Sequence, residues 1–260
     1  HRDLHKEYRR QRQMCIRDSY IGDGDVVMVG TGMPMVASLL ALKTHAPHMC
    51  FVVETGPIAP EVIPTPVSVS DPRVMHRAVS HGSMIEALGS VLHRGLADIA
   101  FLGGAQIDQF ANINSTVIGK YDRPKVRLPG SGGANDMASH AKKILIIAAH
   151  EKRRFPPHCD YITSPVYIDG PEGRKNAGIP VPYPDIHVVT NLSVMSINKT
   201  SGKLTLSKLM PGISKETVLS NTSFNPDSGI PLQEVAPASE QELKTLRDEV
   251  DPKGIYIKRV

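Results

Sequence analysis

Short apolar runs alternate with helical segments up to about residue 150, and this alternation is the strongest constraint on the fold. A glycine-containing turn closes each of the first three runs. Strands that alternate with helices favour βαβ units, in which parallel strands form a sheet covered by helices. The sequence therefore predicts an α/β fold with a mostly parallel sheet, with strands expected at Val26–Val29, Phe51–Val53, Ile99–Leu102 and Ile144–Ala148.

The intervening segments contain three expected helices. Residues 35–43 are apolar and rich in Ala and Leu, the apolar residues between 84 and 92 recur at helical spacing, and a short helix is expected from about Asn135, after the glycine loop 130–133. Residues 57–73 carry many prolines and no helical period, so we expect an extended segment there.

The last third of the chain has a different pattern. Val188–Ile197 and Leu204–Leu209 read as strands, and the polar segment 198–203 between them predicts a β-hairpin. Ser239 and Glu242 have the spacing of a capping box, which predicts a C-terminal helix running to about Val250.

The first nineteen residues are basic, polar and aperiodic, and we expect them to be a non-native segment. Residues 14–19 resemble the translation of an adapter sequence used in DNA library preparation. A native basic tail is the alternative, because solvated charge runs are common in proteins. We therefore expect one domain over residues 20–260 and leave residues 1–19 out of the argument about function.

Composition excludes several classes of partner. The net charge is only +4, much of it in the first twenty residues, so there is little case for nucleic acid or an anionic membrane. No apolar run reaches the roughly 18 residues that span a bilayer. The three cysteines, Cys15, Cys50 and Cys159, show no CxxC spacing and are expected to be reduced thiols of a cytoplasmic protein.

The candidate site lies where the expected strands end. Ligands of open α/β sheets bind beyond the carboxyl ends of the strands. Glu54 directly follows the second run, and a carboxylate fixed there beside glycine loops suits covalent catalysis. Taken singly, each glycine loop is as well explained by a tight turn, and Glu54 by a solvated loop. The loops concerned are 30–34, 103–106 and 130–133.

Five short motifs follow one another along the chain. They are Glu-x-Gly at 54–56, GGAQxD at 103–108 with Asn112 and Asn114, GSGGAN at 130–135, HEKRRF at 150–155 and ITSP at 162–165. In this order and at this spacing they resemble the motifs of family I coenzyme A transferases, and in particular those of the β subunits of the glutaconate branch. The resemblance covers roughly residues 20–257.

The resemblance implies a fold, a reaction and a partner. The fold would be a three-layer, doubly wound, mostly parallel sheet with a C-terminal hairpin and helix. Glu54 would attack an acyl-CoA and carry CoA as a glutamyl thioester before passing it to a carboxylic acid. The family's β chain shares its active site with an α subunit, so the resemblance implies a hetero-oligomer.

The same resemblance implies further site residues. The loop residues Gly132, Gly133, Ala134 and Asn135 would bind CoA and stabilise oxyanions. Gly30, Gly32 and Gln106 would form substrate loops. No cofactor is expected beyond CoA and acyl-CoA as substrates. No metal is expected either, because the histidine pairs 45/48 and 76/81 lack the spacing of a metallohydrolase helix.

Two other readings stay open. The same scaffold could carry an acyl-CoA hydrolase or a ring-opening lyase, as in steroid or aromatic degradation, although some relatives of that kind lack the glutamate. A ligand-binding domain without catalysis would not need Glu54 beside glycine loops. The run Lys152–Arg154 could meet CoA phosphates or a partner subunit, and a solvated, salt-bridged loop is equally consistent with it.

Overall fold

The computed structural model describes residues 18–257 except 31, 69, 182 and 228–230. The chain divides into two compact units. The first comprises residues up to Phe101 together with those from Ala236 onwards, and the second is Leu102–Val235. Nothing in the sequence pattern indicated this division.

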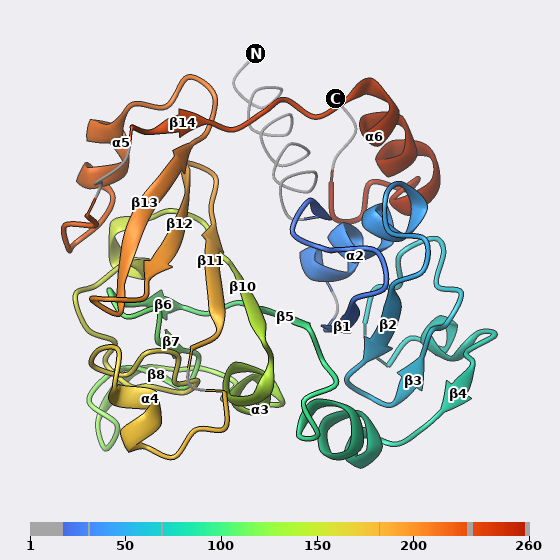
Figure 1. Cartoon of the computed structure of the whole chain (residues 1–260), viewed down its shortest axis with the longest axis horizontal. Helices are drawn as coiled ribbons and strands as arrows, with labels where there is room; N and C mark the ends of the chain where they lie inside the picture. Colours follow the sequence, from blue (N-terminus) through green and yellow to red (C-terminus); the bar gives the residue numbers. More distant parts are fainter. Residues whose placement is uncertain (1–17, 31, 69, 182, 228–230, 258–260) are drawn as a thin grey trace. The chain divides into compact units, whose positions relative to one another are not determined.

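The first unit is an α/β layer built on a short sheet (Figure 1). β1 is the centre of three parallel strands and pairs with β2 on one side and β5 on the other, while β3 and β4 continue the sheet antiparallel. The strands are β1 (Val26–Val29), β2 (Cys50–Val53), β3 (Pro57–Ile58), β4 (Ser80–His81) and β5 (Ile99–Leu102). Valine is the commonest residue of β1 and β2, β5 is wholly apolar, and most residues of the three strands are buried, as expected of strands covered on both faces.

Helix α2 (Met33–Lys43) packs against β1 and against the C-terminal helical segment. That segment is α6 (Glu240–Thr245) followed by η4 (Leu246–Val250), and the predicted capping box of Ser239 and Glu242 opens it. The expected helices at 35–43 and 239–250 are therefore confirmed. The first unit also contains η1 (Pro72–Met75) and η2 (Glu86–Leu92).

The segment at 84–92 is helical, as predicted, but most of it is not an α-helix. Its residues from Glu86 to Leu92 form a π-helix, and Met84 and Ile85 are exposed. Helical spacing of apolar residues reports a common face, and here only Leu92 and Ala87 of that segment are buried.

The second unit holds the sheet β10–β11–β12–β13–β14 (Figure 1). β10 and β11 are parallel, and β12 and β13 form the predicted hairpin. The strands are β10 (Lys143–Ile147), β11 (Asp185–Val189), β12 (Ser193–Asn198), β13 (Lys203–Leu209) and β14 (Gln233–Glu234).

The remaining elements of this unit are short. They are β6 (Gln106–Ile107), β7 (Ile113–Asn114), β8 (Val117–Gly119), β9 (Pro124–Arg127), α3 (Ala134–His140), η3 (Lys152–Arg154), α4 (Gly173–Asn176) and α5 (Lys215–Ser220). β6 pairs with β7, and β8 with β9, as two antiparallel ribbons.

The single strand expected over Val188–Ile197 was wrong, because the run contains a tight turn. Val188 and Val189 end β11, and β12 begins at Ser193. The hydroxyl of Thr190 accepts hydrogen bonds from the backbone N–H groups of Leu192 and Ser193 at 3.1 and 2.9 Å. This side chain fixes a turn that apolar patterning does not reveal.

Asp18, at the start of the described chain, is a buried carboxylate without a charged partner. It is fully inaccessible to solvent, neither side-chain oxygen forms a hydrogen bond of normal geometry with a described residue, and the nearby Ser19 N–H offsets only part of the cost of burial. Burial, with the nearby charge of Glu242, raises the pKa of Asp18 from 3.8 to about 8. The ionised form is therefore penalised in the folded state.

We expect Asp18→Asn to stabilise the fold in a pH-dependent way. The folded pKa lies above the unfolded value, so ionisation costs folding free energy that grows as the pH rises from about 4 to about 8. The variant should melt several degrees higher than the original chain at pH 8 and at nearly the same temperature at pH 4. Thermal melts across that range check this, and equal melting temperatures at pH 8 would contradict it.

Candidate functional site

The register of β1 and β2 places Glu54 beside Gly30. Val29 pairs with Val53 in the parallel ladder, and the Glu54 N–H lies 3.4 Å from the Val29 carbonyl oxygen. A Cβ atom added at Gly30 would lie 3.6 Å from Glu54 Oε1. The glycine thus leaves a bare backbone next to the carboxylate at the carboxyl ends of two neighbouring strands, where ligands bind in such sheets.

Glu54 is available for chemistry. The residue is half-buried, and its carboxylate forms no hydrogen bond or ion pair with any residue that the structure describes. Burial raises the pKa of Glu54 above its usual value. A partly desolvated carboxylate with no internal partner is poorly stabilised as a charged ground state, which suits a nucleophile.

The turn after Glu54 depends on glycine. Gly56 has φ +124°, and a Cβ there would lie 2.0 Å from the carbonyl oxygen of Gly82. Its N–H donates to the Val53 carbonyl oxygen at 2.9 Å, closing the turn that aims Glu54. Any side chain at position 56 would displace the turn.

Gly32 has a different place from Gly30. It is the residue before α2, has φ +96°, and its carbonyl oxygen accepts from the Val36 N–H at 3.2 Å. Thr31, between the two glycines, lies outside the described residues. The role of Gly32 in a substrate loop stays a prediction.

The loop 130–133 in the second unit presents free backbone donors. The N–H groups of Ser131, Gly132 and Gly133 donate to no described residue, and Ser131 and Gly132 are exposed. Gly132 has φ +50°, and a Cβ there would meet open space. Unpaired, accessible N–H groups beside open space can bind an anionic oxygen.

Ser115 holds this loop in place. Its hydroxyl donates to the Gly130 carbonyl oxygen, and its own carbonyl oxygen accepts from the Gly130 N–H, both at 2.8 Å. The Ser115 N–H in turn donates to the Thr163 hydroxyl at 2.9 Å. Sequence reasoning did not identify Ser115, since a serine after the Asn-x-Asn motif has no distinguishing pattern.

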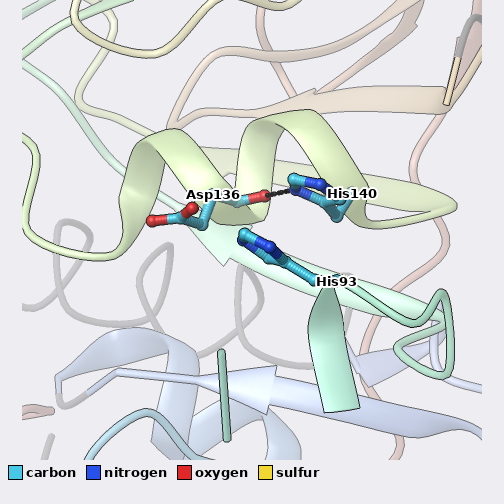
Figure 2. A group of neighbouring side chains, drawn as sticks. All are labelled: His93, Asp136 and His140. Atoms are coloured by element: carbon cyan, nitrogen blue, oxygen red, sulfur yellow. Dashed lines mark hydrogen bonds between the residues drawn. The ribbon is translucent and has the colours of Figure 1, made fainter. Parts of the chain in front are cut away.

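The site residues after the loop form the first turn of α3. Ala134 begins the helix and its N–H donates to the Ser131 carbonyl oxygen at 2.9 Å, while Asn135 is exposed. Figure 2 shows this helix, with His140 Nδ1 3.1 Å from the backbone oxygen of Asp136 one turn earlier. His93, also drawn there, belongs to the first unit, where its N–H donates to the Leu88 carbonyl oxygen at 2.9 Å.

Gln106, expected in a substrate loop, is instead engaged within its own unit. It is buried, its side-chain oxygen accepts from Asn114 Nδ2 and the Asp160 N–H at 2.7 and 3.0 Å, and its nitrogen donates to Asp160 at 3.2 Å. Asn112 and Asn114 are likewise buried and fully paired. These motif amides hold the second unit together.

The basic run 152–154 is a salt-bridged turn. Arg153 and Arg154 both pair with Glu151, at 2.7 and 3.6 Å. Arg154 also donates to the carbonyl oxygen of Gly104 at 3.2 Å, so it supports the glycine loop that follows β5. The solvated, salt-bridged alternative therefore describes Arg153, and Arg154 serves the internal packing.

Arg174 is a buried cation that the sequence did not single out. It is inaccessible to solvent and donates to the carbonyl oxygens of Ala138 and Ser139 at the end of α3, among five carbonyls in all. A cation at a helix C-terminus complements the helix dipole. Arg174 therefore fixes the end of the helix whose start follows the loop 130–133.

The structure thus brings Glu54 together with Gly30 in the first unit, and Ser115 together with the loop 130–133 in the second. Cys50 and Cys159 are free thiols, and Cys15 lies outside the described residues. Among the described residues, no helix combines the length and the hydrophobicity that a membrane crossing needs. The expectation that the site uses no metal stays a prediction.

Comparison with known proteins identifies the class. Residues 14–221 match the model of the family described as coenzyme A transferase, so the match includes part of the segment expected to be non-native. The chain therefore belongs to the coenzyme A transferase family and by that membership is part of a transferase.

Comparison with individual relatives shows which members of the family the chain resembles. The chain is 38% identical to the β subunit of glutaconate CoA-transferase from Acidaminococcus fermentans, over 91% of this chain and 90% of the relative. It is 37% identical to the β subunit of 3-oxoadipate CoA-transferase from Pseudomonas knackmussii, over 86% of each. The crystal structure of the Acidaminococcus fermentans glutaconate enzyme matches 97% of this chain and 98% of that chain at a TM-score of 0.91 and 36% identity. The expected α/β fold of the CoA-transferase type is thereby confirmed.

We expect Arg174→Met to destabilise the protein strongly. The change removes the guanidinium donor from five carbonyl oxygens in buried or partly buried bonds, and losing hydrogen bonds from a charged group costs about 1.5–3 kcal/mol each before relaxation. The melting temperature should fall by roughly 10 °C or more. Arg153→Met, at a side chain that is 77% exposed, is the control and should change it by less than about 2 °C. Equal melting temperatures for the two variants would refute the role of Arg174.

Proposed function

We propose that this chain is the β subunit of a CoA transferase that moves CoA from an acyl-CoA donor to a carboxylic acid acceptor through a glutamyl-CoA thioester on Glu54. The observation that carries the proposal is the Glu54 carboxylate: half-buried, without an internal partner, and directly beside Gly30 at the carboxyl ends of β1 and β2. A structural glutamate at this position would be expected to have a donor or to face solvent.

The proposed chemistry balances without a cofactor. The Glu54 carboxylate attacks the donor thioester, forming a mixed anhydride and releasing CoA as a thiolate. The thiolate attacks the Glu54 carbonyl of the anhydride, which forms the glutamyl-CoA thioester and releases the donor acid. The acceptor carboxylate then attacks this thioester, and the same two steps in reverse give the new acyl-CoA and free Glu54. One thioester replaces another, so no energy source is consumed.

Each attack passes through a tetrahedral oxyanion, and the proposal assigns its stabilisation to the Gly132 and Gly133 N–H groups. Support comes from their lack of acceptors among the described residues and from the open space at Gly132. Fixed backbone donors cost no reorganisation when charge develops. Gly30 would let the reacting acid approach Glu54 closely, since it places no side chain there.

The named relatives suggest a partner and a substrate class. Each is named as one subunit of its enzyme, so we propose that this chain works with an α subunit in a hetero-oligomer, and in the cytoplasm. Their names specify glutaconate and 3-oxoadipate, which are both dicarboxylic acids, so a dicarboxylic acid is the proposed substrate class.

The hydrolase and lyase alternative is not favoured. The two relatives that align with most of this chain at 37–38% identity are both named as CoA transferases. Transfer and hydrolysis differ in whether water reaches the acyl-enzyme, so the release of free CoA without acceptor distinguishes them.

The first test is covalent labelling of Glu54. The chain is co-expressed with its α subunit and incubated with glutaconyl-CoA or 3-oxoadipyl-CoA, and the thioester is trapped with borohydride or hydroxylamine. Peptide mapping should find the modification at Glu54, and the chain without an α subunit should transfer nothing. Modification at another residue would sink the proposal.

Glu54→Gln supplies the matched variant. It should lower kcat by several orders of magnitude, because the nucleophile is lost. It should also raise the melting temperature slightly at neutral pH: the raised pKa means that the charged form is penalised in the fold, and the amide removes that cost. A variant that is inactive and less stable would instead indicate a structural role for Glu54.

Gly133→Val tests the oxyanion donors. Gly133 has φ −77° and ψ −1°, so a side chain adds bulk there without the strain that Gly132, at φ +50°, would suffer. We expect kcat to fall about a hundredfold with a smaller change in KM, because the interaction is strongest in the transition state. Gly133→Ala should be intermediate. A loss of thermal stability with unchanged kcat would assign the glycine to the turn alone.

A further inference from the structure

The hairpin formed by β8 and β9 carries an unneutralised cluster of positive charge. Four basic side chains and one carboxylate, all exposed, lie on its strand and turn: Lys120, Arg123, Lys125, Arg127 and Asp122. None of the four cations forms a salt bridge with a carboxylate of the described chain. Like charges held close together and unpaired attract an anion of high charge density.

The same hairpin carries exposed aromatic surface in a fixed stack. The rings of Tyr121 and Tyr161 lie 5.3 Å apart with an interplanar angle of 25°. The Arg127 guanidinium lies 4.9 Å from the Tyr121 ring centroid and donates to the Tyr121 carbonyl oxygen at 3.2 Å. Tyr121 is nevertheless 58% exposed and Tyr161 39% exposed. Exposed rings beside a guanidinium form a platform on which a nucleobase can stack.

Hydrogen bonds of the Asp160 carboxylate and backbone hold this platform in place. The Asp160 carboxylate accepts from the Gly119 N–H at 2.8 Å and from Gln106 at 3.2 Å, which joins the base of the hairpin to the residue before Tyr161. The Asp160 N–H donates to the Gln106 side chain at 3.0 Å. A preformed site loses less conformational entropy when a ligand binds.

The hairpin continues directly into the loop with the free N–H donors. Only Leu128 and Pro129 separate Arg127 from Gly130. The Leu128 N–H donates to the Thr116 carbonyl oxygen at 2.9 Å, so the connection is anchored to the segment that also carries Ser115. One extended ligand could therefore place a reactive end at the loop and a charged, aromatic end on the hairpin.

We propose that the β8–β9 hairpin, together with Tyr161, binds the phosphorylated adenosine end of the CoA ester, an inference that rests on the proposed function. That end of CoA carries a purine, a diphosphate and a 3′-phosphate. Lys120, Arg123 and Lys125 contact the phosphates, and the Tyr161–Tyr121–Arg127 stack receives the purine. The cations alone could bind many anions. The adjoining aromatic stack favours an anion that also carries a nucleobase.

The test neutralises the cations and leaves the stack intact. The variant Lys120→Gln/Arg123→Gln/Lys125→Gln is co-expressed with the α subunit, and titration calorimetry measures binding of CoA and of adenosine 3′,5′-bisphosphate, the nucleotide end alone. Exposed charge pairs contribute modestly and the variant removes three of them, so the Kd for both probes should rise at least about threefold. The salt dependence of binding should weaken as well. Tyr161→Ala should weaken binding of both probes without altering the salt dependence.

The control removes the same charge elsewhere in the second unit. Lys175→Gln/Lys199→Gln/Lys208→Gln changes three other exposed lysines and should leave both Kd values within about twofold. Unchanged Kd values in the hairpin variant would overturn the proposal, and so would an equal loss in the control. Failure of the hairpin variant to assemble with the α subunit would also overturn it, because the hairpin would then be an intersubunit contact.

The proposed nucleotide site and the proposed reaction can be refuted independently of each other. If Glu54 is never acylated while bisphosphate binding still depends on the hairpin, the proposed reaction is wrong and the nucleotide site stands. If Glu54 is acylated and bisphosphate binding ignores the hairpin, the reaction stands and the nucleotide site is wrong.

Discussion

The parallel pairing of β1 with β2 is the constraint on which the candidate chemistry depends. In a parallel ladder the carboxyl ends of two neighbouring strands lie at the same edge, and the pairing of Val29 with Val53 brings the residues after them into contact. A shift of one residue would turn the Glu54 side chain to the opposite face of the sheet. Burial of valine on both faces of these strands fixes the register, and so hydrophobic packing far from any substrate aims the carboxylate.

In the second unit, buried polar side chains stabilise the loops. Its loops contain few regular hydrogen bonds, and buried side chains replace them: Asp108 accepts from the N–H groups of Phe110 and Asn112, while Asn112 accepts from those of Val166 and Ile168. Burial raises the pKa of Asp108, although these donors oppose the shift. A network of this kind is stable only when every member is paired. Full pairing makes the loops that contain these residues rigid. Rigid loops can hold backbone donors ready for an oxyanion and aromatic rings ready for a base.

Residues from different motifs of the family differ in whether they have hydrogen-bond partners. The Glu54 carboxylate and the N–H groups of Gly132 and Gly133 have no hydrogen-bond partners among the described residues. By contrast, Gln106 and Asn114, from motifs equally typical of the family, form a hydrogen bond with each other. Hydrogen-bond accounting separates the two groups: the amides are engaged inside the second unit, and the role of Gln106 in a substrate loop stays a prediction. Arg174 and Ser115 belong to the supporting group, although no motif marks them.

The sequence by itself determined the α/β class, the positions of β1, β2, β5 and β10 to within a residue or so, the β12–β13 hairpin and the capped C-terminal helix. These follow from local apolar runs, glycine turns and a capping box, whose physics acts within a few residues. Its place after a buried strand and the resemblance to the Glu-x-Gly motif also made Glu54 the candidate nucleophile, a role that stays a prediction. Tertiary structure alone decided the turn at Thr190, the pairing of Gln106, the burial of Arg174 and the stack of Tyr121 on Tyr161. Each of these joins groups through packing and hydrogen bonds that the local pattern does not encode: Tyr121 and Tyr161 are forty residues apart in the chain, and bonds such as that from the Gly119 N–H to Asp160 bring the two segments together.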